Sequence, residues 1–188
     1  MMIITAFSLM ISCSGDGKDI KISDTLKSIE YEQLPLRVGE RPKTTDRIPH
    51  YQLDLDLVPE VHEEMIRRIY NISGIEEQPS MIRSWQGLSL EDNIEIVNPQ
   101  ALIGDRELGH VHDDGSLHIY LEPSRAIEAI DSGWAVSHPF AVEGREDWEG
   151  YVMLYTPQSI EELNVVFQLI VDAFNYVTGQ QVKATDIY

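Results

Sequence analysis

The chain has 188 residues, of which 43% are hydrophobic and 24% charged, values that suit one globular domain with a sizeable core. Its formal net charge at pH 7 is −18, which excludes nucleic acid as a partner and excludes charge-driven binding to anionic lipid. Cys13 is the only cysteine, so an intrachain disulfide is excluded as well.

Residues 1–13 have the pattern of a bacterial lipoprotein signal segment. The apolar run ends with a small residue directly before Cys13, and a polar stretch follows it. The run is too short to span a bilayer. We therefore predict lipidation at Cys13, a flexible tether over residues 14–33, and a location in the bacterial cell envelope with this lipid as the only membrane contact. No Lys or Arg precedes the run, so a buried N-terminus on a cytoplasmic protein stays an alternative.

The folded domain is predicted to cover residues 34–188 and to begin with an irregular arm. Prolines and a glycine interrupt residues 34–51, which argues against regular structure there. The arm also gathers basic side chains in an acidic chain, and these are expected to pair with acidic surface nearby. Strict alternation over residues 52–57 predicts a strand.

A helix is predicted to start at Pro59 and to end before Gly74. Proline suits the first helical turn, glutamates suit the N-terminal end, and apolar residues recur at helical spacing. His62 lies on this helix and is expected to be an exposed polar residue. Weak alternation predicts strands over residues 81–90 and 94–97.

The second half of the chain predicts a helix from Pro123 to a terminating Gly133, a strand over residues 134–140, and an apolar, central strand over residues 151–155. The longest helix is predicted over residues 160–178, with a capping box at its start, and it should pack across a sheet. Together the elements predict one α+β domain, in which a mostly antiparallel sheet packs against helices and a long C-terminal helix.

The most informative stretch is the predicted β-hairpin over residues 106–120. His110, His112 and His118 fall within nine residues, on both sides of the strong turn sequence Asp-Asp-Gly-Ser. A loop of two or four residues would mix histidines with leucines on each face. A three-residue loop with Gly115 in the left-handed conformation places His110 opposite His118 and separates polar from apolar side chains, so we prefer it.

In this preferred register one face of the hairpin carries the three histidines together with Leu108 and Tyr120. By alternation Arg106 shares this face and Glu107 does not. Arg106 is therefore a candidate to hold an anionic substrate, although an ion pair with one of the 32 carboxylates is the simpler role.

Three uses of the histidine face stay open from the residues alone. His110, His112 and His118 could bind a divalent metal such as zinc, iron or copper. A glycine six residues before His110 matches the opening of a cupin metal motif, but the glutamate expected after the second histidine is missing. Without metal, the imidazoles could take a proton from an acidic hydroxyl group. The third reading is a structural face, in which the histidines bond to Tyr120 and to the backbone.

The order of several short blocks resembles the luciferase-like domain family. The blocks are E-L-G-H-V-H, L-H-I-Y-L, G-W-A-V-S-H-P and L-Y-T-P, followed by the long apolar helix. The resemblance runs from about residue 34 to residue 179. It implies O₂-dependent oxidation of a hydroxylated pyrone without metal or organic cofactor, in a dry aromatic pocket that protects a peroxide intermediate.

The resemblance also implies site residues. His110, His112, His118 and His138 are the matching positions for catalysis, and Trp134 and Tyr155 are the matching positions for an aromatic pocket that binds the substrate. Arg106 and Tyr120, which come from the hairpin face and not from the resemblance, are further candidates for substrate binding. Gln158 stands where the family's fungal members have arginine, and the hairpin loop is shorter. We therefore expect an oxygenase of a small enolic or phenolic compound that emits no light. The alternatives are an envelope protein that binds a small ligand without catalysis and a metal-dependent, cupin-like enzyme.

Overall fold

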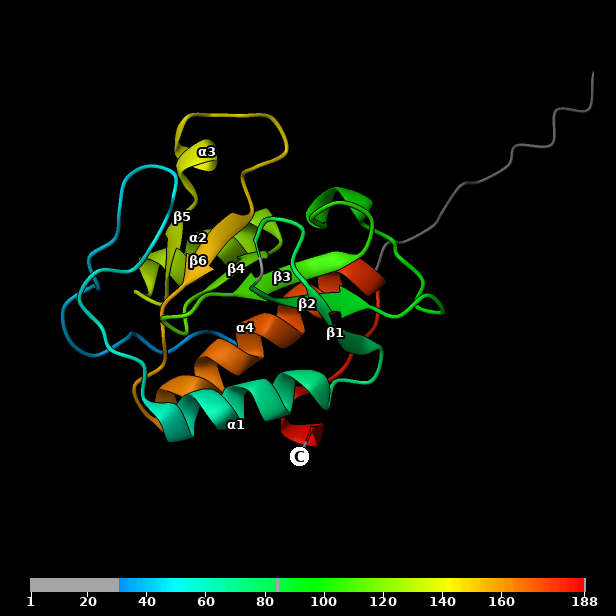
Figure 1. Cartoon of the computed structure of the whole chain (residues 1–188), viewed down its shortest axis with the longest axis horizontal. Coiled ribbons are helices and arrows are strands. Elements are labelled where there is room, and N and C mark those ends of the chain that lie inside the picture. Colours follow the sequence, from blue (N-terminus) through cyan, green and yellow to red (C-terminus); the bar gives the residue numbers. More distant parts are fainter. Residues whose placement is uncertain (1–30, 84, 188) are drawn as a thin grey trace, which may run out of the picture.

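The computed structural model describes residues 31–83 and 85–187 of the chain. The predicted signal segment, Cys13 and most of the tether lie outside the described residues. In chain order the elements are α1 (Pro59–Tyr70), β1 (Ile75–Pro79), β2 (Gln86–Leu90), η1 (Pro99–Ala101), β3 (Glu107–Val111), β4 (Leu117–Tyr120), α2 (Pro123–Asp131), β5 (Ala135–Ser137), α3 (Pro139–Val142), β6 (Tyr151–Leu154), α4 (Ile160–Thr178) and η2 (Ala184–Asp186) (Figure 1).

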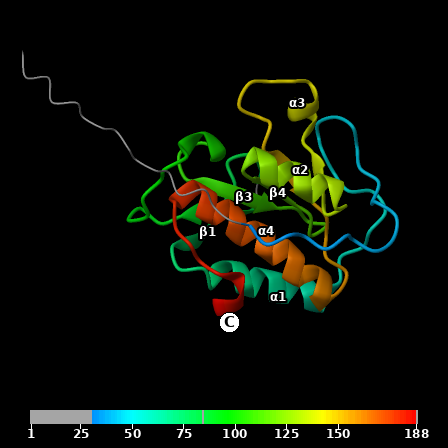
Figure 2. The same cartoon turned by 180° about the vertical axis from the view of Figure 1, so that it is seen from behind.

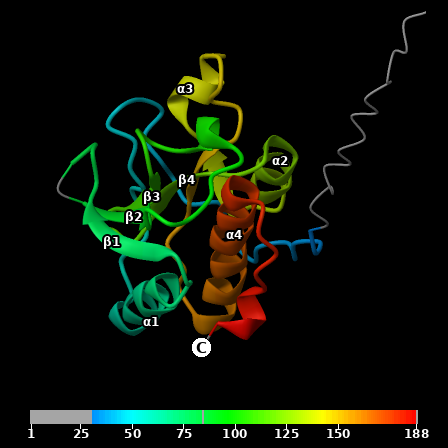
Figure 3. The same ribbon diagram turned by 90° about the vertical axis from the view of Figure 1, so that its right-hand side faces the viewer.

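The strands form one six-stranded sheet in the order β1-β2-β3-β4-β6-β5, and every neighbouring pair is antiparallel. Helices α1, α2 and α4 lie against one face of this sheet, as the views from behind and from the side show (Figures 2 and 3). The start of the arm, residues 34–37, packs beside α2 on the helix side, as its hydrogen bonds to Glu128 and Ser132 show. The later part of the arm, around His50, and the α3 segment lie toward the other face (Figure 1). The predicted α+β class, with a long C-terminal helix, is confirmed.

Helix α4 is the main apolar partner of the sheet and has the predicted bounds. Ser159 caps its N-terminus by accepting a hydrogen bond from the Glu162 amide, and Gly179 ends it in the left-handed conformation with φ 70°. Its inward stripe joins the core, including Phe167, Ile170 and Phe174, each at most 1% exposed. Burying a large apolar side chain contributes about 2 kcal/mol, so this stripe holds the helix on the sheet. No helix in the described part of the chain is long and apolar enough to cross a membrane.

Four strand predictions were wrong or too long, because the backbone groups pair elsewhere or a helix begins. The strand predicted over residues 81–90 covers only Gln86–Leu90, and the Met81 amide donates to Glu107 instead. Residues 52–57 form no strand: Gln52 bridges to Thr44 within the arm, and its side-chain amide pairs with Thr156. Residues 94–97 form a loop, in which the Val97 amide donates to the end of α4 rather than to a strand. The predicted strand over residues 134–140 stops at Ser137, because Pro139 begins α3.

Candidate functional site

The histidine hairpin has the predicted three-residue loop. His110 lies opposite His118, the His112 amide donates to the Ser116 carbonyl at 2.8 Å, and Gly115 has φ 80°. An added Cβ at Gly115 would lie 3.0 Å from the Thr156 methyl group, so the turn is also closely packed. Segregation of polar and apolar faces therefore selected the correct register.

We expect Gly115→Ala to lower the free energy of unfolding by roughly 1–3 kcal/mol, because alanine is strained at positive φ and its methyl group would press on Thr156. Gly144→Ala is the matched control: Gly144 has φ 72°, but a Cβ added there would have no neighbouring atom within 4 Å. Urea unfolding of both variants separates the two causes. Equal losses would contradict the packing contribution.

A β-bulge at the start of β3 exchanges the places of two neighbouring side chains. Leu88 pairs with Gly109 but Ser89 pairs with Glu107, so Leu108 is the extra residue. As a result Leu108 points into the core, where it is fully buried, and Glu107 lies on the histidine face beside His110. The prediction that Glu107 lies off this face and Leu108 on it was wrong, because simple alternation does not hold across a bulge.

The same bulge removes Arg106 from the histidines. Its guanidinium donates to the backbone carbonyls of Leu90, Glu91 and Ile94, and so holds the loop after β2. Arg106 was placed on the histidine face by alternation, and the structure corrects this. The structure gives Arg106 a backbone-binding position outside the cluster.

A further histidine reaches the hairpin from the arm. His50 is 3% exposed, and its Nδ1 lies 3.0 Å from His118 Nε2. The arm is held in place by the bridge between Thr44 and Gln52 and by two hydrogen bonds between the Gln52 amide group and Thr156, each 3.2 Å long. These contacts bring residue 50 onto the open face of the sheet.

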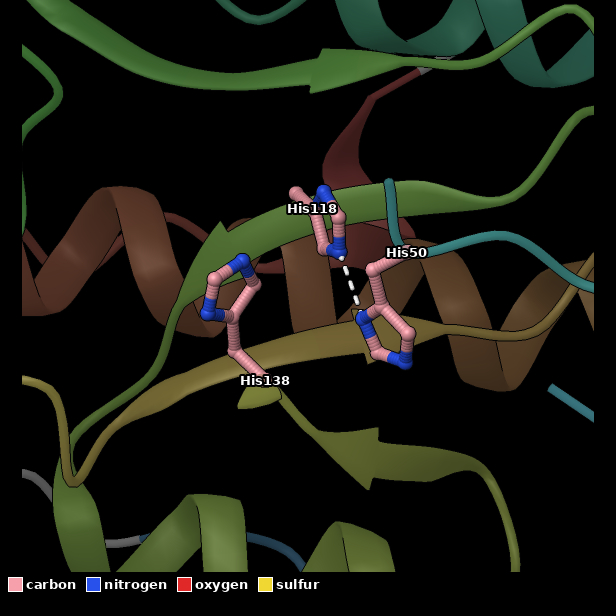
Figure 4. A group of neighbouring side chains, drawn as sticks. All are labelled: His50, His118 and His138. Atoms are coloured by element: carbon pink, nitrogen blue, oxygen red, sulfur yellow. Dashed lines mark hydrogen bonds between the residues drawn. The ribbon is translucent and has the colours of Figure 1, made fainter. Parts of the chain in front are cut away.

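His138 completes the group from the other side. It directly follows β5, its backbone amide donates to the Tyr151 carbonyl, and its ring lies 5.0 Å from that of His118. Its Nδ1 accepts the Phe140 backbone amide at 3.2 Å and so caps α3. Figure 4 shows His50, His118 and His138 pointing toward one another from the arm, β4 and the start of α3.

These five residues form what we call the histidine cluster: His50, His110, His112, His118 and His138. All five are buried, with exposed fractions between 2% and 5%. Aromatic rings surround them: Trp85 stacks on His110, Trp148 stacks on His138, and Tyr151 stacks on His118. Such a wall excludes water and strengthens any electrostatic interaction inside it.

One ordered hydrogen-bond chain runs through the cluster to the hairpin turn. The Ser116 hydroxyl donates to the Asp114 carboxylate at 2.6 Å, so Ser116 Oγ accepts from His112 Nδ1, 2.9 Å away. His112 Nε2 then carries a lone pair toward His118 Nδ1, at 3.1 Å, and His118 Nε2 faces His50. Asp114 therefore fixes the tautomer of His112, and through it those of the next two rings.

His110 stands outside this chain and is held by Glu107. Its Nδ1 lies 2.9 Å from Glu107 Oε1, which also accepts from Ser80, while Oε2 accepts the Met81 amide. Burial raises the pKa of Glu107, but the hydrogen bonds from His110, Met81 and Ser80 outweigh it and leave the pKa lowered. The Glu107 carboxylate accepts a hydrogen bond from His110 Nδ1–H, so Nε2 of the neutral His110 ring carries the lone pair. That atom is buried without a hydrogen-bond partner among the described residues.

Burial keeps most of the cluster uncharged at neutral pH. It lowers the pKa of His50, His112 and His138 to about 4, and the pKa of His118 falls well below its ordinary value; neighbouring histidines add repulsion at all of these except His50. Neutral imidazoles are hydrogen-bond acceptors and potential metal ligands.

Comparison with known proteins finds a similarity to luciferases. The luciferase domain model matches residues 105–173, which contain four of the five cluster histidines. The luciferase of Armillaria mellea is 26% identical over 175 residues, covering 81% of this chain and 64% of that protein. The luciferase of Armillaria gallica is 27% identical over 169 residues, covering 78% and 62%. Residues 105–173 therefore resemble a luciferase domain, and the chain as a whole is similar to these luciferases.

The chain spans a little under two thirds of the length of these curated luciferases. No solved structure matches it significantly. The match of the luciferase domain model begins two residues before β3 and ends within α4, so it includes the histidine hairpin but not the arm that supplies His50.

The structure brings some predicted site residues of this luciferase-like domain together and separates others. His110, His112, His118 and His138 lie in one cluster. Tyr120 instead stacks on Tyr176 of α4, and the Trp134 indole donates to the Pro35 carbonyl. Tyr155 is buried beside Trp134, whose carbonyl accepts its backbone amide. Roles for all these residues in the luciferase-like domain stay predictions.

Sequence reasoning missed His50, Glu107 and most of the aromatic wall. Glu107 is only three residues from His110, but simple alternation places the two side chains on opposite faces, and the sequence did not reveal the bulge that brings them onto one face. His50 is 68 positions from His118 and lies in an irregular arm, where no periodicity assigns a face. His62 was also misjudged: it is half-buried on α1, with its Nδ1 close to the Gly115 turn.

Two trios within the cluster have ligand atoms close enough to hold a metal ion. They are His50, His118 and His138, and His110, His112 and His118, with all ligand nitrogens of a trio within 4.8 Å of one another. Imidazole nitrogen suits zinc, copper, iron and nickel rather than magnesium or calcium.

Proposed function

We propose that this protein is an oxygenase that oxidises a small enolic or phenolic compound with O₂ at the histidine cluster. The observation that supports it best is the buried, unpaired Nε2 of His110, backed by the Glu107 carboxylate and enclosed by aromatic rings. A planar compound with an acidic hydroxyl group would supply the missing hydrogen bond and stack on those rings.

The proposed reaction starts with removal of the hydroxyl proton. In the metal-free site His110 Nε2 takes it, and Glu107, 2.9 Å from Nδ1, stabilises the imidazolium that forms. The enolate carbon then gives electrons to O₂ and forms a new C–O bond. The resulting peroxide takes the proton back, so the enol becomes a ketone with a neighbouring hydroperoxide, and O₂ is reduced by two electrons. The aromatic wall would keep water from the peroxide.

O₂ uptake tests this proposal. Hydroxypyrones and catechols would be screened with an oxygen electrode, and we expect at least one to be consumed with O₂. His110→Gln should lower the rate by roughly 10²–10⁴-fold, because it removes the base while keeping a polar side chain beside Glu107. His62→Gln, outside the cluster, is the control and should leave the rate unchanged.

If no compound supports O₂ uptake while some still bind, the oxygenase proposal fails and the protein is a ligand-binding protein. Photon counting during turnover tests the further proposal that no light is emitted.

The proposed envelope location has its own test: a radiolabelled fatty acid should be incorporated into the wild type expressed in bacteria and not into Cys13→Ser.

A further inference from the structure

We infer that His110, His112 and His118 form a binding site for one divalent transition-metal ion, through Nε2, Nε2 and Nδ1 respectively. The inference rests on the proton positions of His110 and His112 and on the contact between His118 and His50. It does not depend on the proposed reaction.

A histidine that ligates a metal uses one ring nitrogen and normally donates the other N–H to an outer partner. His110 fits this rule, because Nδ1 is paired with Glu107 and Nε2 is buried and unpaired. A metal ion would satisfy that nitrogen, whose burial without a partner is otherwise unfavourable.

His112 fits the same rule through a different partner. The Ser116 hydroxyl donates its one hydrogen bond to Asp114, so toward His112 it can only accept a hydrogen bond from Nδ1–H. The lone pair of His112 is therefore on Nε2, directed at His118. His112 is thus the metal ligand, and the Ser116 hydroxyl links its Nδ1–H to the Asp114 carboxylate outside the site.

His118 becomes the third ligand by a change of tautomer that breaks no contact with the arm. With its lone pair on Nδ1, its Nε2–H donates to His50 Nδ1, 3.0 Å away. His50 then serves as the outer partner, a role that explains why a fifth histidine is buried beside the other rings. His112 Nε2 and His118 Nδ1 are 3.1 Å apart. Two nitrogens about 2.1 Å from one ion at tetrahedral or octahedral angles are about 3.0–3.4 Å apart.

The second trio, His50, His118 and His138, fits less well. His138 Nδ1 accepts the Phe140 amide as the cap of α3, so the ring proton of neutral His138 lies on Nε2, the nitrogen left to face the others. Ligation there would require the proton on Nδ1, against a backbone N–H. That cost is absent for His110 and His112.

A metal ion and direct proton removal by His110 use the same nitrogen and exclude each other. With the ion bound, the hydroxyl group of the proposed substrate would be ionised by metal coordination instead, so the reaction class is unchanged. Metal binding and O₂ uptake can therefore fail separately.

The test uses the full chain without a polyhistidine tag. Elemental analysis after purification should find close to one zinc, iron or copper per chain, and Co²⁺ added to EDTA-stripped protein should give the visible absorption bands of a histidine-bound ion. His110→Gln and His112→Gln should each weaken Co²⁺ binding by more than about 100-fold, and Glu107→Gln by roughly 10–100-fold. Glu76→Gln, on exposed β1, is the matched control and should bind normally.

His138→Asn separates the two trios, because asparagine can still cap α3. We expect it to bind Co²⁺ like the wild type. Loss of binding in His138→Asn with retention in His110→Gln would overturn the assignment in favour of the other trio. Absence of metal in the wild type by both assays, with the fold intact by circular dichroism, would overturn the site itself.

Discussion

The metal-free protein should lose several kcal/mol of stability between pH 6.5 and pH 4. The pKa of His50, His112 and His138 is about 4 in the folded protein, against 6.5 for an unburied histidine. Between these values the unfolded chain binds protons that the folded chain does not, so the free energy of unfolding falls as the pH falls. The stability is fully present above about pH 6.5, and each histidine accounts for roughly 1–3 kcal/mol of the loss.

Urea unfolding in EDTA at half-unit steps from pH 7.5 to pH 4.5 measures this loss. The slope should approach about 1.4 kcal/mol per pH unit for each proton taken up on unfolding. His50→Gln removes one titrating ring, so the slope should fall by up to about 1.4 kcal/mol per pH unit, the contribution of one proton. A stability that stays level from pH 6.5 to pH 4.5 would show that the histidines are not buried as neutral groups.

Arg125→Met should destabilise the protein by about 3–5 kcal/mol, because it leaves a buried carboxylate without its charge partner. Arg125 is 1% exposed; its Nε donates to Asp172 at 2.8 Å, and its Nη1 donates to Glu128 at 2.6 Å and to the Glu32 carbonyl at 2.8 Å. Burial raises the pKa of Asp172 even though Arg125 opposes this. Without Arg125 that carboxylate must protonate or draw in water.

Thermal and urea unfolding measure the effect, and roughly 10 °C of melting temperature should be lost. Arg125→Met with Asp172→Leu should regain much of the stability, because an apolar pair leaves no buried charge. Arg67→Met, at an exposed ion pair with Glu64, is the control and should change little. If the double variant is as unstable as the single one, the loss comes from packing rather than from the uncompensated Asp172.

Elements whose stabilising contacts lie close together in the sequence were predicted well, and elements that depend on distant contacts were predicted poorly. Both ends of helix α4 were predicted correctly, because its cap, its apolar stripe and its terminating glycine all lie within the helix or next to it. The short strand β5 was overextended because Pro139 begins a helix there. Residues 52–57 alternate like a strand, yet Gln52 is buried and Leu53 is 62% exposed, because the side-chain contact with Thr156 sets the orientation.

The sequence by itself determined the hairpin register, since only one loop length separates three histidines from the leucines of the same ribbon. The pattern of predicted helices and strands also gave the α+β class, and the order of short blocks gave the similarity to luciferase domains. The tertiary structure decided what surrounds the histidines. A bulge at Leu108 turned Glu107 toward His110, and the arm brought His50 against His118. Both depend on pairing with distant backbone, which periodicity within one segment does not encode.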